Sequence, residues 1–434
     1  MKPFFSGPTR SIALTLAAAT LAACGGGGGG DSLPTVTATA TTGTVAIAAQ
    51  TGAPACAYEE VNVSIARIRF HTDAQAAAGA SGWSELTFSP ARKVNLLNAA
   101  SVLGGATMAF GELKLPTGVY TQMRLVIETP VSTNVAPNTI KLKGATTTVT
   151  LETPAYLASE GVKMPIDLRI EDGKKADVVF DFDACNAIQP RSANYLLRPI
   201  SRVVPAALNG ITGFIDKTAL TSDVVVTAQQ GGINATATAP NPTTGEFMLP
   251  RLPAGNYDVV ITARGRATSV IGQVPVAAST TVAVSTVAAP VALATSTSSR
   301  ITGQVGYAAG KVAPDSGTFV AASQAIAANA TTGIPASTFG VRFQPVDQAT
   351  GNYTMTDLPR ASLRYALYKP ALPLVLANIV TIPVAGHYKV EAVANGYSRV
   401  STFGTNSTGV PNATATADIN VLTADAANVN ILFY

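Results

Sequence analysis

The sequence predicts a mainly β protein with an N-terminal β-rich domain followed by two antiparallel, immunoglobulin-like β-sandwich domains in tandem. At 434 residues, the chain is long enough for two to four domains that each bury a core. Charged residues make up 12% of it, about half the ~25% of ordinary soluble domains, and small or β-branched residues replace them. Short apolar runs alternate with polar residues between Gly and Pro clusters, which is typical of strands joined by turns.

The first residues have the features of an export signal. Lys2 and Arg10 are positive, and Ser11 to Leu21 is apolar but too short to span a bilayer. Residues 21–25 read Leu-Ala-Ala-Cys-Gly, which resembles the lipobox of bacterial lipoproteins. The resemblance implies that residues 1–23 are a cleaved lipoprotein signal peptide and that Cys24 carries the lipid. The alternative is an ordinary secretory signal with an incidental cysteine.

Residues 24–42 are expected to be a tether, because the polyglycine run after Cys24 has no side chains to pack. More than one acyl chain on Cys24 would make the membrane anchor stable. A glycine instead of an aspartate after the cysteine points to the outer membrane under the sorting preference of enteric bacteria. We therefore expect a lipid-anchored protein of the bacterial cell envelope.

Composition argues against a nucleic-acid-binding protein and against a protein with a membrane-spanning helix. The net charge is +4, and no basic stripe with interleaved aromatic residues is present, so a nucleic-acid partner is not expected. The most apolar segment, Ala371 to Ala385, contains Pro373 and Pro383 and is shorter than a spanning helix. We interpret it as strands or a loop.

The first folded unit is predicted over residues 43–207. It begins with a strand at Thr44–Ala49 and a longer strand at Tyr58–Phe70, in which the apolar residues change phase near Ala66-Arg67. A one-residue change of phase indicates a β-bulge. Residues 119–127 also alternate, which predicts a buried face that includes Val119 and Thr121.

Two hairpins are expected in the second half of this unit. Ile140–Leu151 reads as a hairpin around Lys143-Gly144. Met164 to Ile170 alternates cleanly, and after an Asp-Gly turn Val178 to Phe182 is expected to return as the partner strand.

The motifs of this unit resemble a bacterial lipoprotein family, catalogued as domain of unknown function 4382. The resemblance is carried by an ordered set of segments: Cys56–Val63, Gly82-Trp83, Asn95–Leu97, Leu115–Leu125, Asp181–Cys185 and Tyr195–Pro199. Two segments, Thr51–Pro54 and Thr153–Ala155, depart from the expected pattern. The resemblance implies a fold and a location in the cell envelope but no activity.

Two cysteines remain once Cys24 is lipidated. An even count in an exported protein suggests a disulfide between Cys56 and Cys185. The alternative is two separate buried thiols.

Residues 208–293 are predicted to form the second unit and residues 294–434 the third. Gly210–Phe214, Thr244–Leu249 and Leu252–Val259 occur in an order that resembles the carboxypeptidase regulatory-like module, a prealbumin-type β-sandwich without catalytic residues. The order recurs after a Ser/Thr/Ala linker, where Ile301–Val305 matches Ile211–Ile215. The third unit is therefore predicted to be a degenerate second copy, with an insertion around residues 361–386.

No catalytic constellation is evident. His71 and His387 are the only histidines, no Gly-x-Ser-x-Gly elbow is present, and the remaining cysteines are expected to pair. These observations predict a protein that is not an enzyme and that has neither a cofactor nor a histidine- or thiolate-ligated metal.

One polar cluster is a candidate ligand or ion patch. Asp181 and Asp183 project from one strand face, and Asp167 is expected on the neighbouring strand. A calcium site or a sugar-binding patch that includes Arg124 or Trp83 are the alternatives to a solvated polar face, which we prefer. Trp83 is more simply explained as a residue that packs on the sheet.

The sequence thus predicts a lipid-anchored envelope protein with a binding, adhesion or structural role, whose partner is a polysaccharide or an envelope protein. A carbohydrate-binding accessory lipoprotein is the alternative, and an unrecognised hydrolase is a weaker one. The carbohydrate alternative predicts exposed aromatic residues in one plane, drawn from Tyr353, Tyr365, Tyr368 and Tyr388.

Overall fold

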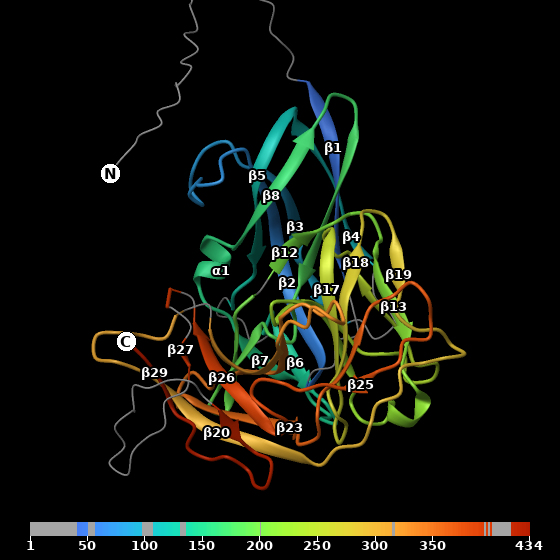
Figure 1. The fold of residues 1–434 in the computed structure, drawn as a ribbon. Helices are drawn as coiled ribbons and strands as arrows, with labels where there is room; N and C mark the ends of the chain where they lie inside the picture. The colour runs from blue at the N-terminus through green and yellow to red at the C-terminus, as the bar shows by residue number, and fades with distance from the viewer. Residues whose placement is uncertain are drawn as a thin grey trace, which may run out of the picture. The chain divides into compact units, whose positions relative to one another are not determined.

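The computed structural model describes residues 41–50, 57–97, 107–130, 136–199, 201–314, 317–394, 396–397, 400–401 and 418–434. Residues 41–434 form one compact unit. Nearly all of its elements are β-strands, which confirms the predicted mainly β class with β-sandwich domains in tandem (Figure 1). Among the described residues, no helix has the length and apolar character needed to cross a membrane. The predicted signal peptide, Cys24 and the polyglycine run lie outside the described residues.

The first unit has two sheets and one short helix, α1 (Tyr156–Ser159). Its strands are β1 (Thr42–Gln50), β2 (Tyr58–His71), β3 (Ser84–Asn95), β4 (Thr107–Pro116), β5 (Gly118–Ile127), β6 (Thr139–Leu142), β7 (Val149–Glu152), β8 (Val162–Ile170), β9 (Lys175–Phe182), β10 (Ile188–Arg191), β11 (Asn194–Leu197) and β12 (Ser201–Val204). One sheet has the order β12-β9-β1-β4, and the other has the order β10-β11-β7-β6-β2-β5-β8 with β3 paired to β2. Apolar side chains from both sheets, such as Ile47 and Met123, form one buried cluster.

The predicted bulge in β2 is confirmed. The register against both β3 and β5 shifts between Ile65 and Arg67, so Ala66 is the extra residue. Ile65 and Ile68 both reach the core although their sequence spacing places them in opposite phases. The predicted hairpin of β6 and β7 is confirmed as well, with Ile140 opposite Val149.

A second bulge, in β8, was not predicted. Tyr120 of β5 pairs with Leu168 but Gln122 pairs with Pro165, so the extra residue lies in β8. The predicted alternation of β5 is also wrong at its start: Tyr120 is buried in the same cluster as Met123, whereas Val119, which was predicted for the buried face, is 38% exposed.

The prediction that β9 returns as the partner of β8 is wrong. β8 pairs with β5, whereas β9 crosses to the other sheet and pairs with β1 and β12. The backbone explains the difference, because the residues between the two strands bond to β1. The N–H of Thr44 donates to the carbonyl of Lys174 at 2.9 Å, and the N–H of Gly173 donates to that of Thr42 at 3.0 Å.

The second unit is a sandwich of two sheets. Its strands are β13 (Gly210–Phe214), β14 (Val225–Gln230), β15 (Ile233–Thr238), β16 (Glu246–Pro250), β17 (Gly255–Thr262), β18 (Ser269–Val276) and β19 (Thr281–Ala283), and a 3₁₀ turn spans Lys217–Ala219. One sheet has the order β16-β13-β19, and the other begins β15-β14-β17-β18.

The third unit repeats this topology. Its strands are β20 (Ser298–Tyr307), β21 (Thr318–Ile326), β22 (Ser337–Pro345), β23 (Asn352–Pro359), β26 (His387–Ala394), β27 (Val400–Ser401), β28 (Ile419–Asn420) and β29 (Ile431–Phe433). The sheet β23-β20-β29 corresponds to β16-β13-β19, with the same antiparallel and parallel pairs, and β22-β21-β26-β27 corresponds to β15-β14-β17-β18.

A glycine opposite an aromatic residue recurs in the two sandwiches. Gly213 pairs with Phe247, and Gly303 pairs with Tyr353. A Cβ atom on Gly213 would lie 2.7 Å from the ring of Phe247, and one on Gly303 would lie 2.9 Å from the hydroxyl of Tyr353. Gly213 therefore makes room for the ring behind it, whereas at Gly303 a side chain would meet the backbone carbonyl of Val429 before the tyrosine.

The insertion predicted for the third unit completes a sheet of the second. It contains β24 (Arg364–Leu367) and β25 (Ala377–Asn378), and β24 pairs in parallel with β18. An apolar cluster joins Val260 and Val270 of the second unit to Ile326 and Phe339 of the third, with Tyr365 of the insertion. The two sandwiches are thus linked by a shared sheet and a shared cluster.

A glutamine side chain also connects the sandwiches. The amide of Gln229 donates to the carbonyl of Gly340 at 2.9 Å and accepts from its N–H at 2.9 Å. Gly340 lies in β22, at the edge of its sheet, so Gln229 satisfies backbone groups that a neighbouring strand would otherwise bind.

All three units use the same contact where the chain passes from one sheet to the other. The hydroxyls of Tyr120, Tyr257 and Tyr388 donate to the carbonyls of Pro116, Pro253 and Pro359 at 3.1, 2.9 and 2.6 Å. The contact is a tyrosine corner of the kind found in immunoglobulin-like sandwiches. In the third unit, the insertion separates the proline from the tyrosine in sequence, yet the bond is kept.

We expect Tyr388→Phe to lower the free energy of unfolding by about 1 to 3 kcal/mol, because it leaves a buried carbonyl without its donor. Tyr368→Phe is the control, since the Tyr368 hydroxyl bonds to no residue that the structure describes. Urea unfolding of both variants measures the difference, and equal stabilities would contradict a structural role for the corner.

We expect Gln229→Met to cost about 1 to 3 kcal/mol as well, since both backbone groups of Gly340 lose their partner. Gln304→Met, which removes an exposed amide bonded only within its own unit, is the matched control. If both variants unfold at the same urea concentration, Gln229 does not connect the units.

Candidate functional site

A cavity of 570 Å³, called here the Asp181 cavity, lies where the three units meet. Asp181 and Asp183 of the predicted patch line it, together with Arg202 of β12. Apolar side chains such as Ile233 form much of the remaining wall. The Oε1 atom of Gln50 also faces this cavity region and is buried without a hydrogen-bond partner among the described residues.

The two aspartates of this cavity have protein partners. Asp181 forms an ion pair with Arg202 at 2.7 Å. Burial raises the pKa of Asp181, and Arg202 opposes that effect. Asp183 accepts from the N–H and the side-chain amide of Asn186 at 3.1 and 2.8 Å, so it holds the turn after β9.

Asp167 does not join them. It is exposed on β8, which lies in the other sheet of the first unit, so the expectation that it neighbours Asp181 is wrong. No group of three or more His, Cys, Asp or Glu side chains that could hold a metal occurs in the described part of the chain. The structure therefore brings Asp181 and Asp183 to one cavity without assembling the three-carboxylate cluster.

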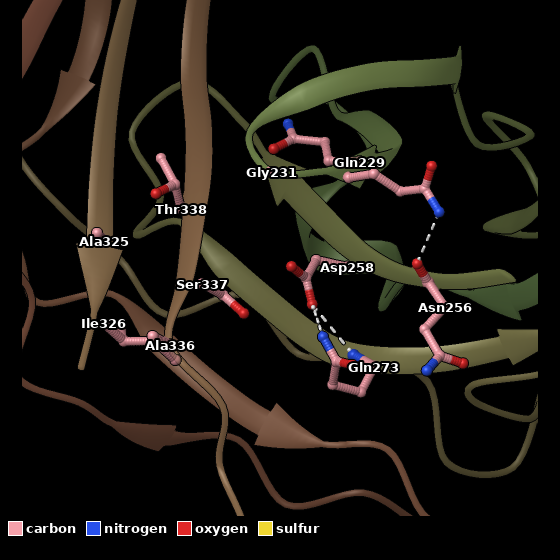
Figure 2. A pocket seen from close by; sticks show the side chains of 11 residues that line it. Gln229, Gly231, Asn256, Asp258, Gln273, Ala325, Ile326, Ala336, Ser337 and Thr338 are labelled. Atoms are coloured by element: carbon pink, nitrogen blue, oxygen red, sulfur yellow. Dashed lines mark hydrogen bonds between the residues drawn. The ribbon is translucent and has the colours of Figure 1, made fainter. Parts of the chain in front are cut away.

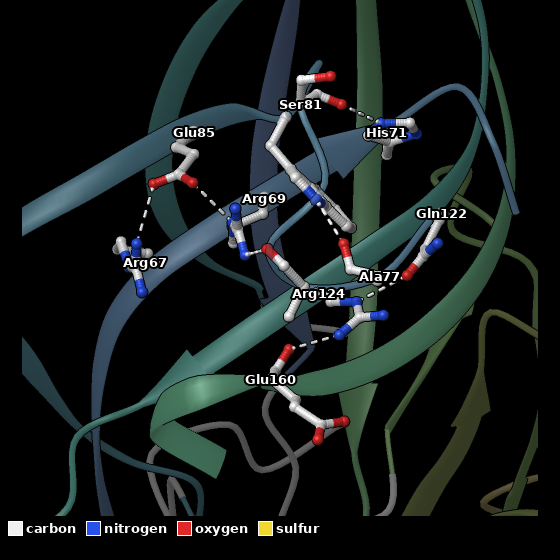
Figure 3. A network of polar contacts seen from close by, with 11 residues as sticks. Arg67, Arg69, His71, Ala77, Ser81, Glu85, Gln122, Arg124 and Glu160 are labelled. Carbon is white, nitrogen blue, oxygen red and sulfur yellow. Dashed lines mark hydrogen bonds and ion pairs between the residues drawn. The ribbon is translucent and has the colours of Figure 1, made fainter. Parts of the chain in front are cut away.

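Trp83 and Arg124 do not line this cavity. They belong to a separate polar network over β2 and β5, in which Figure 3 shows Arg124 with Gln122 and Glu160. The Arg69 and Arg124 guanidiniums lie 4.5 and 5.3 Å from the Trp83 ring centroid, and the indole N–H donates to the carbonyl of Ala77 at 3.0 Å. Arg124 also donates to the carbonyl of Glu160 at 2.9 Å. The network attaches two loops to the sheet, in agreement with the packing interpretation of Trp83.

The two histidines occupy different units and bind neighbouring groups. His71 contacts the carbonyl of Ser81 at 2.9 Å through Nε2 and accepts from the N–H of Asp73 at 2.9 Å through Nδ1. His387 contacts Asp418 at 2.6 Å.

The predicted plane of exposed tyrosines is wrong. Tyr353, Tyr365 and Tyr388 are 4, 4 and 1% exposed. Burial raises the pKa of all three hydroxyls, that of Tyr365 to about 12. Their spacing in the sequence does not distinguish rings on a surface from rings that fill the core between two sheets.

A second cavity, which the sequence analysis missed, lies between the second and third units (Figure 2). It has a volume of 450 Å³, and we call it the Asp258 cavity. Amide and hydroxyl residues and a few aliphatic ones line it: Gln229, Gln230, Asn256, Gln273, Ser337, Thr338, Ala325, Ile326 and Ala336, with Gly231. The signal in the sequence is an aspartate inside the otherwise apolar run of residues 257–261.

Asp258 is 4% exposed and lies at a bulge between β17 and β18. Its Oδ1 accepts from the backbone N–H of Gln273 at 3.1 Å and from the side-chain amide at 3.4 Å. Gln273 has a φ of +59°, a left-handed conformation that costs a non-glycine residue energy. Burial raises the pKa of Asp258, and the bonds from Gln273 oppose this.

Cys185 follows β9, and its expected partner Cys56 lies outside the described residues. The disulfide between them and the lipidation of Cys24 stay predictions.

We expect Asp258→Asn to stabilise the protein at neutral pH. A carboxyl whose folded-state pKa is raised contributes stability below the ordinary aspartate pKa and loses it as the pH rises through the folded-state value. The asparagine keeps an acceptor for Gln273 and carries no charge. Thermal unfolding of the variant and the parent protein is measured at pH 7 and at pH 3. The difference between their melting temperatures should disappear at the lower pH. Asp167→Asn, on the exposed face of β8, is the control. A difference in melting temperature between Asp258→Asn and the parent that does not depend on pH would contradict a raised pKa for Asp258.

Residues 42–199 match the family model described as "Domain of unknown function (DUF4382)", which agrees with the resemblance carried by the motifs. No curated protein matches the sequence. The Bacillus anthracis TIE protein is 10% identical with a TM-score of 0.15, over 90% of this chain and 50% of that chain. The Corynebacterium diphtheriae major pilin SpaA is 13% identical with a TM-score of 0.14, and the Bacillus cereus major pilin subunit BcpA is 11% identical with a TM-score of 0.12, each over 90% of this chain and 99% of the pilin. Scores this low carry no argument about the fold or function of this chain.

Proposed function

We propose that this protein is a lipid-anchored component of the bacterial cell envelope, with a non-enzymatic binding or adhesion role. The observation that carries the proposal is the pair of cavities at the junctions between units, one of which has a buried carboxylate at its wall. Ligand sites occur preferentially at such domain interfaces.

The lipobox-like sequence before Cys24 and the polyglycine run after it support the anchoring part of the proposal. Lipid on Cys24 would hold the protein at a membrane, and the flexible tether would let the three units stand away from its surface. By the sorting preference noted above, that membrane is the outer membrane.

The side chains that could take part in catalysis are bonded to other groups of the protein, which supports a binding role. His71 bonds to backbone groups of the loop that follows it, and His387 bonds to Asp418, which precedes β28 in the same unit. Asp181 is paired with Arg202. Each of these contacts stabilises a turn or a strand end, and none joins a histidine to a nucleophile.

The anchoring part is tested by labelling cells that produce the full chain with radioactive palmitate. We expect the mature protein to carry label and to sediment with membranes, and Cys24→Ala to lose both properties. Cys185→Ala is the matched control and should keep the label. A Cys24→Ala protein that remains labelled and membrane-bound would exclude this anchor.

A further inference from the structure

No cationic side chain among the described residues pairs with the carboxylate of Asp258. It is almost fully buried, yet no ion pair joins it to any residue within the described ranges, and its only hydrogen bonds come from the uncharged Gln273. A buried carboxylate without a positive partner is costly, and a cationic group from outside the chain would offset that cost. Figure 2 shows the second carboxylate oxygen of Asp258 turned toward the cavity, away from Gln273.

The bulge at Asp258 is consistent with a functional site. Gln273 stays in its left-handed conformation because Asp258 holds its N–H. Bulges are common next to binding sites, and here Gly272 and Gln273 of β18 lie opposite Asp258 alone, so that Gln273 donates to its carboxylate. Tyr365 of β24 is the titratable group that faces Asp258 from the neighbouring strand, and the carboxylate charge adds to the raised pKa of its hydroxyl.

The remaining wall suits hydroxyl groups. Amide and hydroxyl side chains, among them Asn256, Ser337 and Thr338, can both donate and accept hydrogen bonds. Ser337 lies across the cavity from Asp258 (Figure 2). Ala325 and Ile326 provide a small aliphatic surface, which matches the C–H face of a sugar ring. The volume of 450 Å³ is within the range of small-molecule pockets.

We propose that the Asp258 cavity binds an amino sugar with a free ammonium group. The ammonium pairs with Asp258, and the ring hydroxyls bond to the amides and hydroxyls around it. The assignment names the ligand class for the binding role proposed above, and it does not depend on the lipid anchor.

Calorimetric titration of the full chain in detergent with glucosamine, N-acetylglucosamine and glucose tests the proposal. We expect saturable binding of glucosamine, weakened by about ten-fold or more for the two sugars that lack the charge. Asp258→Asn should abolish the preference, whereas Asp167→Asn on the exposed face of β8 should keep it. Glucosamine binding should weaken as the pH falls and Asp258 takes up a proton.

Absence of glucosamine binding, equal binding of the three sugars, or unchanged binding by Asp258→Asn would each overturn the proposal. The Asp258→Asn protein is compared with the parent by its unfolding curve, so a loss of fold is distinguished from a loss of the ligand. If glucosamine does not bind, the palmitate labelling at Cys24 can still succeed. If Cys24 is not labelled, the sugar titration can still show binding. The two proposals therefore fail separately.

Discussion

A hydrogen bond from a tyrosine hydroxyl to a proline carbonyl recurs in all three units, at the step from one sheet to the other. In each case a glycine with positive φ stands two residues before the tyrosine, at positions 118, 255 and 386. The glycine lets the chain turn, and the tyrosine fixes the direction in which it leaves. Because the two sheets of a sandwich face each other only if this step is correct, the position of the core and of the cavities depends on it.

The same constraint explains how the third unit tolerates its insertion. The bond between Tyr388 and Pro359 fixes both ends of the inserted segment, so the segment between them is free to pack elsewhere. Its strand β24 adds to the sheet of the second unit, and Tyr365 completes the apolar cluster between the sandwiches. The internal repeat thereby became a pair of connected modules. The Asp258 cavity lies at this junction, with walls from both modules.

Local patterns predicted much of the fold. The phase change near Ala66 revealed the bulge of β2, and Lys143-Gly144 revealed a hairpin, because both signals depend on neighbouring residues. The pairing of β9 was not predictable in this way, because its backbone bonds to β1, which is distant in sequence. The site shows the same limit. Asp181 and Asp183 were found from their alternation, whereas Asp258 gains its importance from burial and from contacts across units.

Hydrogen exchange on the full chain shows whether the second and third units form one cooperative structure. We expect the amides of β17 and β26 to exchange through the same opening, with the same free energy, although they belong to different sandwiches. Separate openings, with one sandwich exchanging at a much lower free energy while the other stays protected, would contradict it.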